Sequence, residues 1–297
     1  MRIGVVILPI YPGNEARARW RDAEAAGFDS AWTYDHLAWR TFRDRTWFGT
    51  VPTLAAAAGA TARIRLGTLV SSPNFRHPVT FAKDVMTLDD LSDGRITLGI
   101  GAGGTGFDAT VLGREAWSPR ERQERFEEFV DLLDRLLTAP ATTYNGRYYA
   151  ADEARMIPGC VQHPRVPFAV AATGPRGMRV AARYGRAWVT FGDPRRLTDR
   201  TPADYLADVA DQIRRLGDIC AADDRDPAGL DRVLLHGSTD ERSLDSVDAF
   251  VDYVGRYAEI GITEIVVHLP VPGTVFDTDP GVFDRVVAEG LPQVRAR

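Results

Sequence analysis

A histidine follows a carboxylate directly after a short apolar run near the N-terminus. The sequence there reads Tyr34-Asp35-His36, and Trp39 follows three residues later. An imidazole can serve as a general acid or base near neutral pH, and the neighbouring Asp35 could orient the ring or stabilise its charge. Alternatively, Asp35 caps the next turn and His36 packs among its neighbours. The residue types therefore make His36 a candidate catalytic residue and leave the structural role open.

Two hydroxyl residues, Ser71 and Ser72, follow the apolar run that ends in Leu69-Val70. Small hydroxyl side chains at such a place can hydrogen-bond the carbonyl groups of a planar ring. The alternative is a plain Ser-Pro loop that leads into a helix. We therefore treat this segment as a candidate binding site for a planar ligand.

A glycine-rich segment follows the next apolar run, with Gly101, Ala102 and Gly103 at its centre. Glycines let the backbone approach a flat or phosphorylated ligand closely. A dinucleotide-binding motif would need a helix directly after the glycines, whereas a loop is expected here. The segment is thus a candidate ligand contact but not a Rossmann-type motif.

A segment rich in glycine and arginine joins a later apolar run to a predicted helix. Free N–H groups at the start of a helix favour an anion, and arginine can bind two oxygens of a phosphate. The alternative is an ordinary helix start with solvated arginines, but a place at the end of a strand favours the phosphate site. The candidate residues are Thr173, Gly174, Pro175, Arg176, Gly177 and Met178.

Two further histidines, His236 and His268, fall near the ends of apolar runs. Together with His36 they could in principle hold a metal ion. The sequence has no HExxH motif, however, and its two cysteines, Cys160 and Cys220, are far apart and outside any CxxC pattern. We therefore predict no metal site and expect both cysteines to be reduced thiols.

Short runs rich in β-branched residues alternate with longer amphipathic stretches along the whole chain. Strands that are each followed by a helix pair in parallel through right-handed crossovers. The predicted strands are Arg2–Leu8, Ser30–Tyr34, Ile64–Val70, Ile96–Gly101, Pro167–Ala171, Ala187–Phe191, Arg232–His236 and Glu264–Leu269. The predicted helices are Asn14–Ala26, Val51–Ala60, Pro78–Leu91, Pro119–Leu137, Gly174–Tyr184, Pro202–Ala221, Ser243–Glu259 and Pro280–Glu289.

Eight such units in a chain of 297 residues fit a closed barrel better than an open doubly wound sheet. We therefore predict an α/β fold, a (β/α)8 TIM barrel that forms a single domain over residues 1–297. Three stretches exceed what a bare barrel needs, and they come after strands 2, 4 and 6: Arg40–Thr50, Thr138–Arg165 and Asp193–Gly229. The second is rich in Tyr, Pro and Gly, and we expect it to lie over the mouth of the barrel, where barrel enzymes have their active sites.

The composition limits the possible partners. The formal net charge is −5 and the isoelectric point about 5.6, which argues against a surface that binds nucleic acid. No stretch approaches the ~20 apolar residues of a membrane span, and the N-terminal residues do not form a secretory signal pattern. We therefore expect a soluble, cytoplasmic protein with a small-molecule substrate.

Several blocks of the sequence match a known family. They read FGTVPTLAAAAGATARIRLGTLV (48–70), RHPVTFAKDVMTLDDLSDGRITLGIGAGG (76–104), ATGPRGMRVAARYGRAWVTFG (172–192) and SLDSVDAFVDYVGRYAEIGITEIVVHL (243–269). These blocks closely resemble the luciferase-like monooxygenase superfamily, and the resemblance covers most of the chain. It implies a barrel that binds FMN or the deazaflavin coenzyme F420, with the ring near the ends of strands 2 to 4. It also implies a non-proline cis peptide bond at Leu69–Val70.

The Asp35-His36 pair followed by Trp39 is similar to the deazaflavin-dependent branch of this family. The resemblance implies that His36 lies beside the ring and moves a proton, with Asp35 and Trp39 completing the catalytic group. It places the ring against Leu69–Ser72 and the strand 4 glycines, and the phosphate on residues 173–178. Phe107 and Tyr144–Tyr149 would then exclude water from the substrate pocket.

One departure and several alternatives accompany this resemblance. Some deazaflavin dehydrogenases carry a glutamate where this chain has Gly104, which argues against a sugar-phosphate dehydrogenase. An FMN-dependent monooxygenase, which uses O2 and reduced FMN supplied by a separate reductase, has the same fold. A non-enzymatic flavin-binding relative and a metal hydrolase are further alternatives. The family implies a homodimer, with a flavin or F420 reductase as a further partner.

Overall fold

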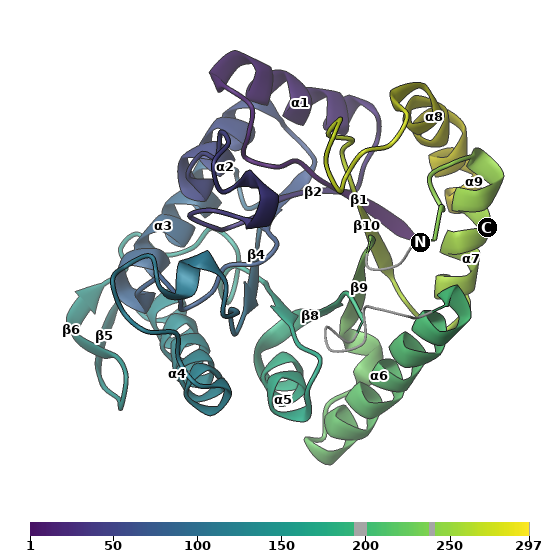
Figure 1. Cartoon of the computed structure of the whole chain (residues 1–297). Helices are drawn as coiled ribbons and strands as arrows, with labels where there is room; N and C mark the ends of the chain where they lie inside the picture. Colours follow the sequence, from purple (N-terminus) through teal and green to yellow (C-terminus); the bar gives the residue numbers. More distant parts are fainter. Residues whose placement is uncertain (193–200, 238–240, 297) are drawn as a thin grey trace.

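The barrel predicted from the sequence is confirmed. A computed structural model of the chain describes residues 1–192, 201–237 and 241–296. Eight parallel strands close into a barrel in the order β1-β2-β3-β4-β7-β8-β9-β10 (Figure 1). Each overlaps one predicted strand. Their bounds are β1 (Arg2–Val6), β2 (Ser30–Thr33), β3 (Arg65–Thr68), β4 (Ile96–Gly101), β7 (Phe168–Ala171), β8 (Gly185–Thr190), β9 (Asp231–Leu235) and β10 (Glu264–His268).

Helices surround the barrel as an outer ring (Figure 1). Proline at the first position and a capping hydroxyl or carboxylate start several of them; in α4, for example, Ser118 accepts a hydrogen bond from the Glu121 N–H ahead of Pro119. No helix in the described part of the chain is long and apolar enough to cross a membrane. The helices are α1 (Gly13–Ala25), α2 (Thr50–Ala60), α3 (Pro78–Leu91), α4 (Pro119–Thr138), α5 (Pro175–Tyr184), α6 (Pro202–Ala222), α7 (Val247–Glu259), α8 (Pro280–Arg285) and α9 (Leu291–Ala296), with the π-helical turn η4 (Val286–Gly290) before α9.

The strands are buried on both faces, because the helices cover the outside and side chains fill the inside. In β10, Ile265 and Val267 belong to the outer core between strands and helices. Val266 belongs to the inner core, together with Val6 of β1 and Trp32 of β2. Side chains along each strand point alternately to the inside and to the outside of the barrel. Because both environments are apolar, apolar residues occur at consecutive positions of the sequence.

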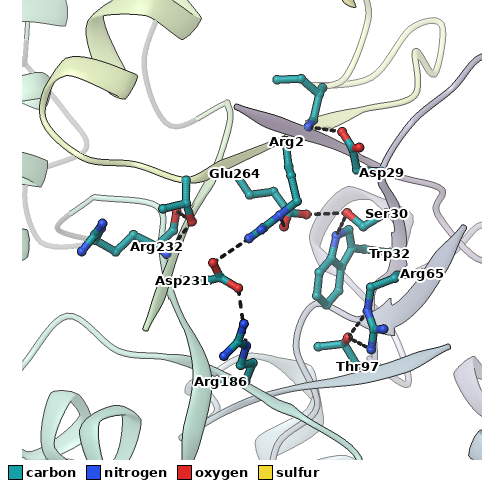
Figure 2. Close-up of polar contacts among 12 residues, drawn as sticks. Arg2, Asp29, Ser30, Trp32, Arg65, Thr97, Arg186, Asp231, Arg232 and Glu264 are labelled. Carbon is teal, nitrogen blue, oxygen red and sulfur yellow. Dashed lines mark hydrogen bonds and ion pairs between the residues drawn. The ribbon is translucent and has the colours of Figure 1, made fainter. Parts of the chain in front are cut away.

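A network of polar side chains closes the N-terminal end of the barrel (Figure 2). The carboxylate of Glu264 is buried and accepts hydrogen bonds from Ser30 Oγ and, at 3.2 Å, from Arg2 Nε. Trp32 Nε1 donates to Ser30 Oγ at 2.7 Å, and Arg2 also pairs with Asp231 at 2.9 Å. The network links β1, β2, β9 and β10 at the end of the barrel that serves stability in this fold.

The insertions take three different forms. After β2 the chain forms the short 3-10 helix η1 (Arg40–Phe42), and after β4 it forms η2 (Phe107–Ala109). The stretch between α4 and β7 contains an antiparallel hairpin of β5 (Ala141–Asn145) and β6 (Ala150–Arg155). Of the third, residues 193–200 lie outside the described part, and the rest forms α6 and the 3-10 helix η3 (Pro227–Gly229).

The expectation that Thr138–Arg165 lies over the mouth is wrong for the hairpin. It packs on the outside of the helix ring, next to α3 and α4 (Figure 1). Glu128 of α4 accepts the N–H groups of Tyr148 and Tyr149 at 2.9 and 2.8 Å, and Lys83 of α3 donates to the Arg155 carbonyl at 2.7 Å. The N–H groups at the hairpin's tip find an acceptor on a helix surface, and this holds residues 144–149 away from the opening.

Gly67 leaves the room that Trp32 needs inside the barrel. A Cβ atom at Gly67 would lie 2.5 Å from the Thr97 carbonyl oxygen and 2.6 Å from the Trp32 ring. We expect Gly67→Ala to lower the free energy of unfolding by ~1–3 kcal/mol, as overpacking of a core does. Urea denaturation followed by circular dichroism would measure this. Gly59→Ala in α2 is the control, because a Cβ there meets nothing within 4 Å; equal losses in both variants would contradict the packing argument.

Candidate active site

The strand order brings the three candidate segments after β2, β3 and β4 to one side of the mouth, the end of the barrel where the strands' C-terminal ends lie. Thr33 and Thr68 are paired in the β2–β3 register, and Leu69 N donates to the Thr33 carbonyl at 2.8 Å. One strand further, Ser71 N donates to the Gly99 carbonyl at 2.8 Å. Residues that are far apart in sequence therefore follow neighbouring strand ends.

His36 is held by a carboxylate that the sequence did not single out. Its Nδ1 lies 2.5 Å from Asp108 Oδ2, and the other oxygen, Oδ1, accepts the Leu37 N–H at 2.9 Å. The Asp108 side chain is 6% exposed, whereas that of His36 is 32% exposed. The imidazole is therefore accessible from the mouth while its carboxylate partner is shielded from water. Trp47 Nε1 also fixes the segment by donating to the His36 carbonyl at 2.7 Å.

Asp35 has a different partner from the one expected. It is buried and receives two hydrogen bonds from Arg76, from Nη2 at 2.7 Å and from Nε at 3.1 Å. The Arg76 guanidinium also lies over the Phe81 ring, 4.7 Å from its centroid. Such a two-point pair joins the loops after β2 and β3 rigidly. Asp35 thus anchors the backbone before His36, and the carboxylate at the ring is that of Asp108.

Aromatic rings connect the ends of β2 and β10 across the mouth. The Tyr34 hydroxyl lies 2.8 Å from His268 Nε2, and the His268 ring stacks on Phe276 with centroids 4.1 Å apart. Trp39 stacks on the other side of this group, with its centroid 5.3 Å from that of Phe276. Trp39 therefore lies in an aromatic wall beside His36.

Burial keeps the second histidine of the mouth neutral. Desolvation, with a smaller effect from His236, lowers the pKa of His268 to about 3. Burial also lowers the pKa of His236 to about 4 and raises that of Tyr34 well above its usual range. His268 and His236 line a cavity of about 410 Å³ at the ends of β9 and β10, a size that suits a small ligand. The described residues contain no group of three or more His, Cys, Asp or Glu placed to hold a metal ion.

The segment after β3 carries polar atoms that lack partners among the described residues. The Leu69–Val70 peptide bond is cis, as predicted. Ser71 and Ser72 are buried, and Ser71 Oγ has no hydrogen-bond partner. The same is true of Asn74 Oδ1, which lies further along this loop. An unpaired buried hydroxyl is rare in proteins, so this segment has unused capacity for a ligand.

Close packing explains the glycines after β4. A Cβ atom at Gly101 would lie 2.9 Å from Val70 Cγ2, and one at Gly103 would lie 2.7 Å from Asn74 Oδ1. Gly103 also has a φ of 75°, which glycine adopts without strain. Ala102 between them is half-buried. The glycines therefore let the loop after β4 lie directly on the loop after β3.

A family model described as luciferase-like monooxygenase matches residues 2–261. The chain belongs to this family. The F420-dependent glucose-6-phosphate dehydrogenase of Beutenbergia cavernae is 33% identical over an alignment of 320 positions. The alignment covers 93% of this chain and 91% of that protein. The 4-hydroxyprotoasukamycin monooxygenase of Streptomyces nodosus subsp. asukaensis is 33% identical and covers 86% of this chain, with 70% of its own length matched.

The fold matches solved structures over its full length. An F420-dependent secondary alcohol dehydrogenase in complex with an F420–acetone adduct superposes with a TM-score of 0.80 at 20% identity, covering 99% of both chains. The monooxygenase RslO1 from Streptomyces bottropensis superposes with a TM-score of 0.75 at 20% identity, again over 99% of both. At these identities the likeness establishes the fold of a luciferase-like barrel.

The predicted phosphate segment of this luciferase-like barrel begins a helix at the end of β7. Gly174 precedes α5 without a side-chain cap, Pro175 takes its first position, and Met178 is buried. Arg176, however, donates to Glu127 of α4 from Nε at 2.9 Å and from Nη2 at 2.6 Å. Its guanidinium is therefore held against α4, whereas Gly177 has only backbone groups to offer and Thr173 also has a hydroxyl.

His268 should contribute to the decrease of the free energy of unfolding at acidic pH. A buried histidine with a lowered pKa binds a proton in the unfolded chain before it does in the folded one. The stability that it contributes is complete above pH 6.5 and is lost as the pH falls from 6.5 towards about 3. We expect His268→Gln to reduce the slope of unfolding free energy against pH in this window by at most ~1.4 kcal/mol per pH unit.

Urea denaturation at a series of pH values would measure that slope. Tyr34→Phe is the control, because it removes the hydroxyl partner of His268 and keeps the ring buried. Since burial is the main cause of the lowered pKa, this variant should retain the slope of the parent protein. A slope unchanged in His268→Gln would mean that His268 is already protonated in the folded protein.

Proposed function

We propose that this protein is an F420-dependent oxidoreductase that transfers hydride between the deazaflavin and a small organic substrate. The observation that carries the proposal is the accessible imidazole of His36, held by Asp108 at the mouth of a luciferase-like barrel. Two F420-dependent glucose-6-phosphate dehydrogenases, 32–33% identical over more than nine-tenths of this chain, support the choice of cofactor.

The residues at the mouth fit a flat, anionic cofactor. Ser71 Oγ has no partner of its own and can bond to a ring carbonyl. Backbone beside Leu69, Val70, Ser72, Gly101, Ala102 and Gly103 would contact the ring. The segment from Thr173 to Met178, which leads into the first turn of α5, would hold the phosphate with its free N–H groups. When bound, F420 supplies or accepts the hydride.

His36 has one ring nitrogen left for the substrate. Because Nδ1 is engaged by Asp108, the proton that accompanies hydride transfer is given or taken at Nε2. Trp39 and the other rings of the aromatic wall exclude water from this side of the mouth. Phe107, against which the Arg43 guanidinium lies at 4.3 Å, would close the opposite side.

The charged residues that line the cavity beside His268 argue against an anionic substrate. Its described lining carries four carboxylates, Glu241, Asp245, Asp277 and Asp279, and one arginine, Arg242; Glu241 pairs with Arg256 outside the lining. Arg242 already pairs with Asp245 at 3.3 Å. A phosphate dianion would meet like charges here. We therefore propose an uncharged substrate with a hydroxyl or carbonyl group.

We further propose that the chain is one domain over residues 1–297 and works in the cytoplasm as a homodimer. A reductase that regenerates the reduced cofactor would be its partner. Sedimentation equilibrium of the purified protein tests the dimer: a mass near 65 kDa, twice the 32.7 kDa of the chain, is expected.

Cofactor choice can be measured first. We expect the purified, cofactor-free protein to bind F420 with micromolar or tighter affinity in a fluorescence titration and to bind FMN at least ten times more weakly. A preference for FMN, together with O2 consumption in the presence of reduced FMN, would establish the monooxygenase instead. Two of the matched proteins are named monooxygenases, and they support this alternative.

His36→Ala should separate binding from chemistry. We expect kcat to fall by ~10²–10⁴, the usual range for a lost acid or base, while the F420 dissociation constant changes less than about threefold. His77→Ala is the control, because this histidine caps α3 and is exposed. Equal turnover in parent and His36→Ala would exclude His36 from the mechanism.

A substrate test follows from the charge of the cavity and from Gly104. We expect no measurable F420 reduction with glucose 6-phosphate under conditions in which the Beutenbergia cavernae relative serves as positive control. Absorbance of the oxidised deazaflavin would follow the reaction. Turnover at a rate comparable to that relative would overturn the assignment of an uncharged substrate.

A further inference from the structure

We propose that Asp108 is the positioning residue of His36, and that it fixes which nitrogen of the ring exchanges the proton. This inference rests on the proposed function only for its effect on turnover. Both Asp108 oxygens contact consecutive residues of one loop: Oδ2 lies 2.5 Å from His36 Nδ1, and Oδ1 accepts the Leu37 N–H at 2.9 Å. The ring and the backbone next to it are thus held by the same carboxylate.

The chemistry of the pair determines the tautomer. An ionised carboxylate can only accept hydrogen bonds, so the nitrogen that faces it must carry the hydrogen. His36 is therefore the Nδ1–H tautomer when neutral, and Nε2 keeps the lone pair. Because Asp108 is buried, water does not compete for this contact. Its negative charge also offsets the positive charge that the ring gains when Nε2 takes up a proton.

Asp35, the carboxylate next to His36 in the sequence, does not have this role. Asp35 is adjacent in sequence, but both of its oxygens are engaged by Arg76. Removing Asp108 therefore leaves the imidazole without an acceptor for Nδ1–H, and the ring is free to rotate or to change tautomer.

The segment that carries Asp108 gives the contact a second consequence. Residues 103–113 cross from the end of β4 to the loop after β2, and they begin and end with glycines of positive φ, Gly103 and Gly113. Val111 and Leu112 on this segment are 52% and 59% exposed, whereas Asp108 and Ala109 are buried. Near its start, Asn74 Nδ2 donates to the Gly104 carbonyl at 3.3 Å. In its middle part, Phe107 lies against the Arg43 guanidinium, and Asp108 binds His36 and Leu37. The contact that orients the ring therefore also helps to hold this segment on the loop after β2.

The tautomer can be observed directly in the cofactor-free protein. Two-dimensional nitrogen–proton spectra of protein labelled with ¹⁵N in its histidines distinguish Nδ1–H from Nε2–H rings, at a pH where the spectra show neutral imidazoles. His36→Gln identifies the His36 signals by their loss. We expect the Nδ1–H pattern for His36 in the parent protein. Asp108→Asn, whose amide group can donate to the ring, should change it to the Nε2–H pattern.

Among the Asp108 variants, kcat should change with the tautomer of His36 and not with the free energy of unfolding. We expect kcat to fall by ~10²–10⁴ in Asp108→Asn, with the F420 dissociation constant within about threefold of the parent value. Asp108→Glu retains a carboxylate and should recover at least tenfold of the activity that Asp108→Ala loses. Asp44→Asn is the matched control, because Asp44 is an exposed carboxylate on the loop after β2. This control should leave both the spectrum and kcat unchanged.

The outcomes separate this inference from the proposed function. An unchanged His36 tautomer and a kcat within threefold of the parent in Asp108→Asn would overturn the positioning role. A changed tautomer without any loss of turnover in Asp108→Asn or in His36→Gln would support the positioning of the ring and remove His36 from the reaction. Loss of activity in Asp108→Asn that Asp108→Glu does not recover, with an unaltered tautomer, would assign Asp108 to folding alone.

Discussion

The arrangement of the whole molecule depends on the alternation of side chains along strands that are buried on both faces. In β10, Glu264, Val266 and His268 point into the barrel, while Ile265 and Val267 point to the helices. The same rule places Ser30 and Trp32 of β2, and Tyr34 directly after it, inside. Each interior layer then has its own chemistry: Ser30 meets Glu264 at the N-terminal end, and Tyr34 meets His268 at the mouth. Glycine at position 4 of the intervening β1 leaves the room for the first of these contacts.

Two histidines of the mouth, His36 and His268, lie in opposite environments. His268 has a neutral partner in Tyr34 and is buried, so it stays uncharged and behaves as part of the aromatic wall. His36 has an anionic partner in Asp108 and is partly open to solvent. Only the second arrangement gives a ring that can gain and lose a proton in reach of a substrate. A distinction of this kind arises from partners and burial, because the two residues are chemically identical.

Local patterns were sufficient to predict the barrel with its strands and surrounding helices, since these depend on periodicity along the sequence. The cis bond at Leu69–Val70 was implied by the family resemblance instead. The partner of His36 was not predictable in the same way. Neighbouring side chains in an extended segment point to opposite sides, so Asp35 was a poor geometric candidate for the ring next to it. Asp108 is 72 residues away and reaches His36 only because β4 lies one strand beyond β3.

The hairpin shows a second limit of local reasoning. The stretch that contains it, Thr138–Arg165, is rich in Tyr, Pro and Gly, a composition typical of loops that line binding sites. The position of the hairpin follows instead from Glu128, an acceptor on the surface of α4 for the N–H groups of Tyr148 and Tyr149. Likewise, Arg176 has the residue type of a phosphate ligand, but Glu127 on the neighbouring helix competes for its guanidinium. In both cases a carboxylate on α4 decides the outcome.

The alternation within β10 also constrains how this chain can change in evolution. Substitution at a single interior position alters one layer and leaves the others intact. Insertion or deletion of one residue would reverse the direction of every side chain beyond it. Glu264 and His268 cannot then both remain in the interior. Either Ser30 would lose its contact with Glu264, or Tyr34 would lose its contact with His268. Length is therefore fixed in the strands, and differences in length among related chains should be found in the segments between strands and helices.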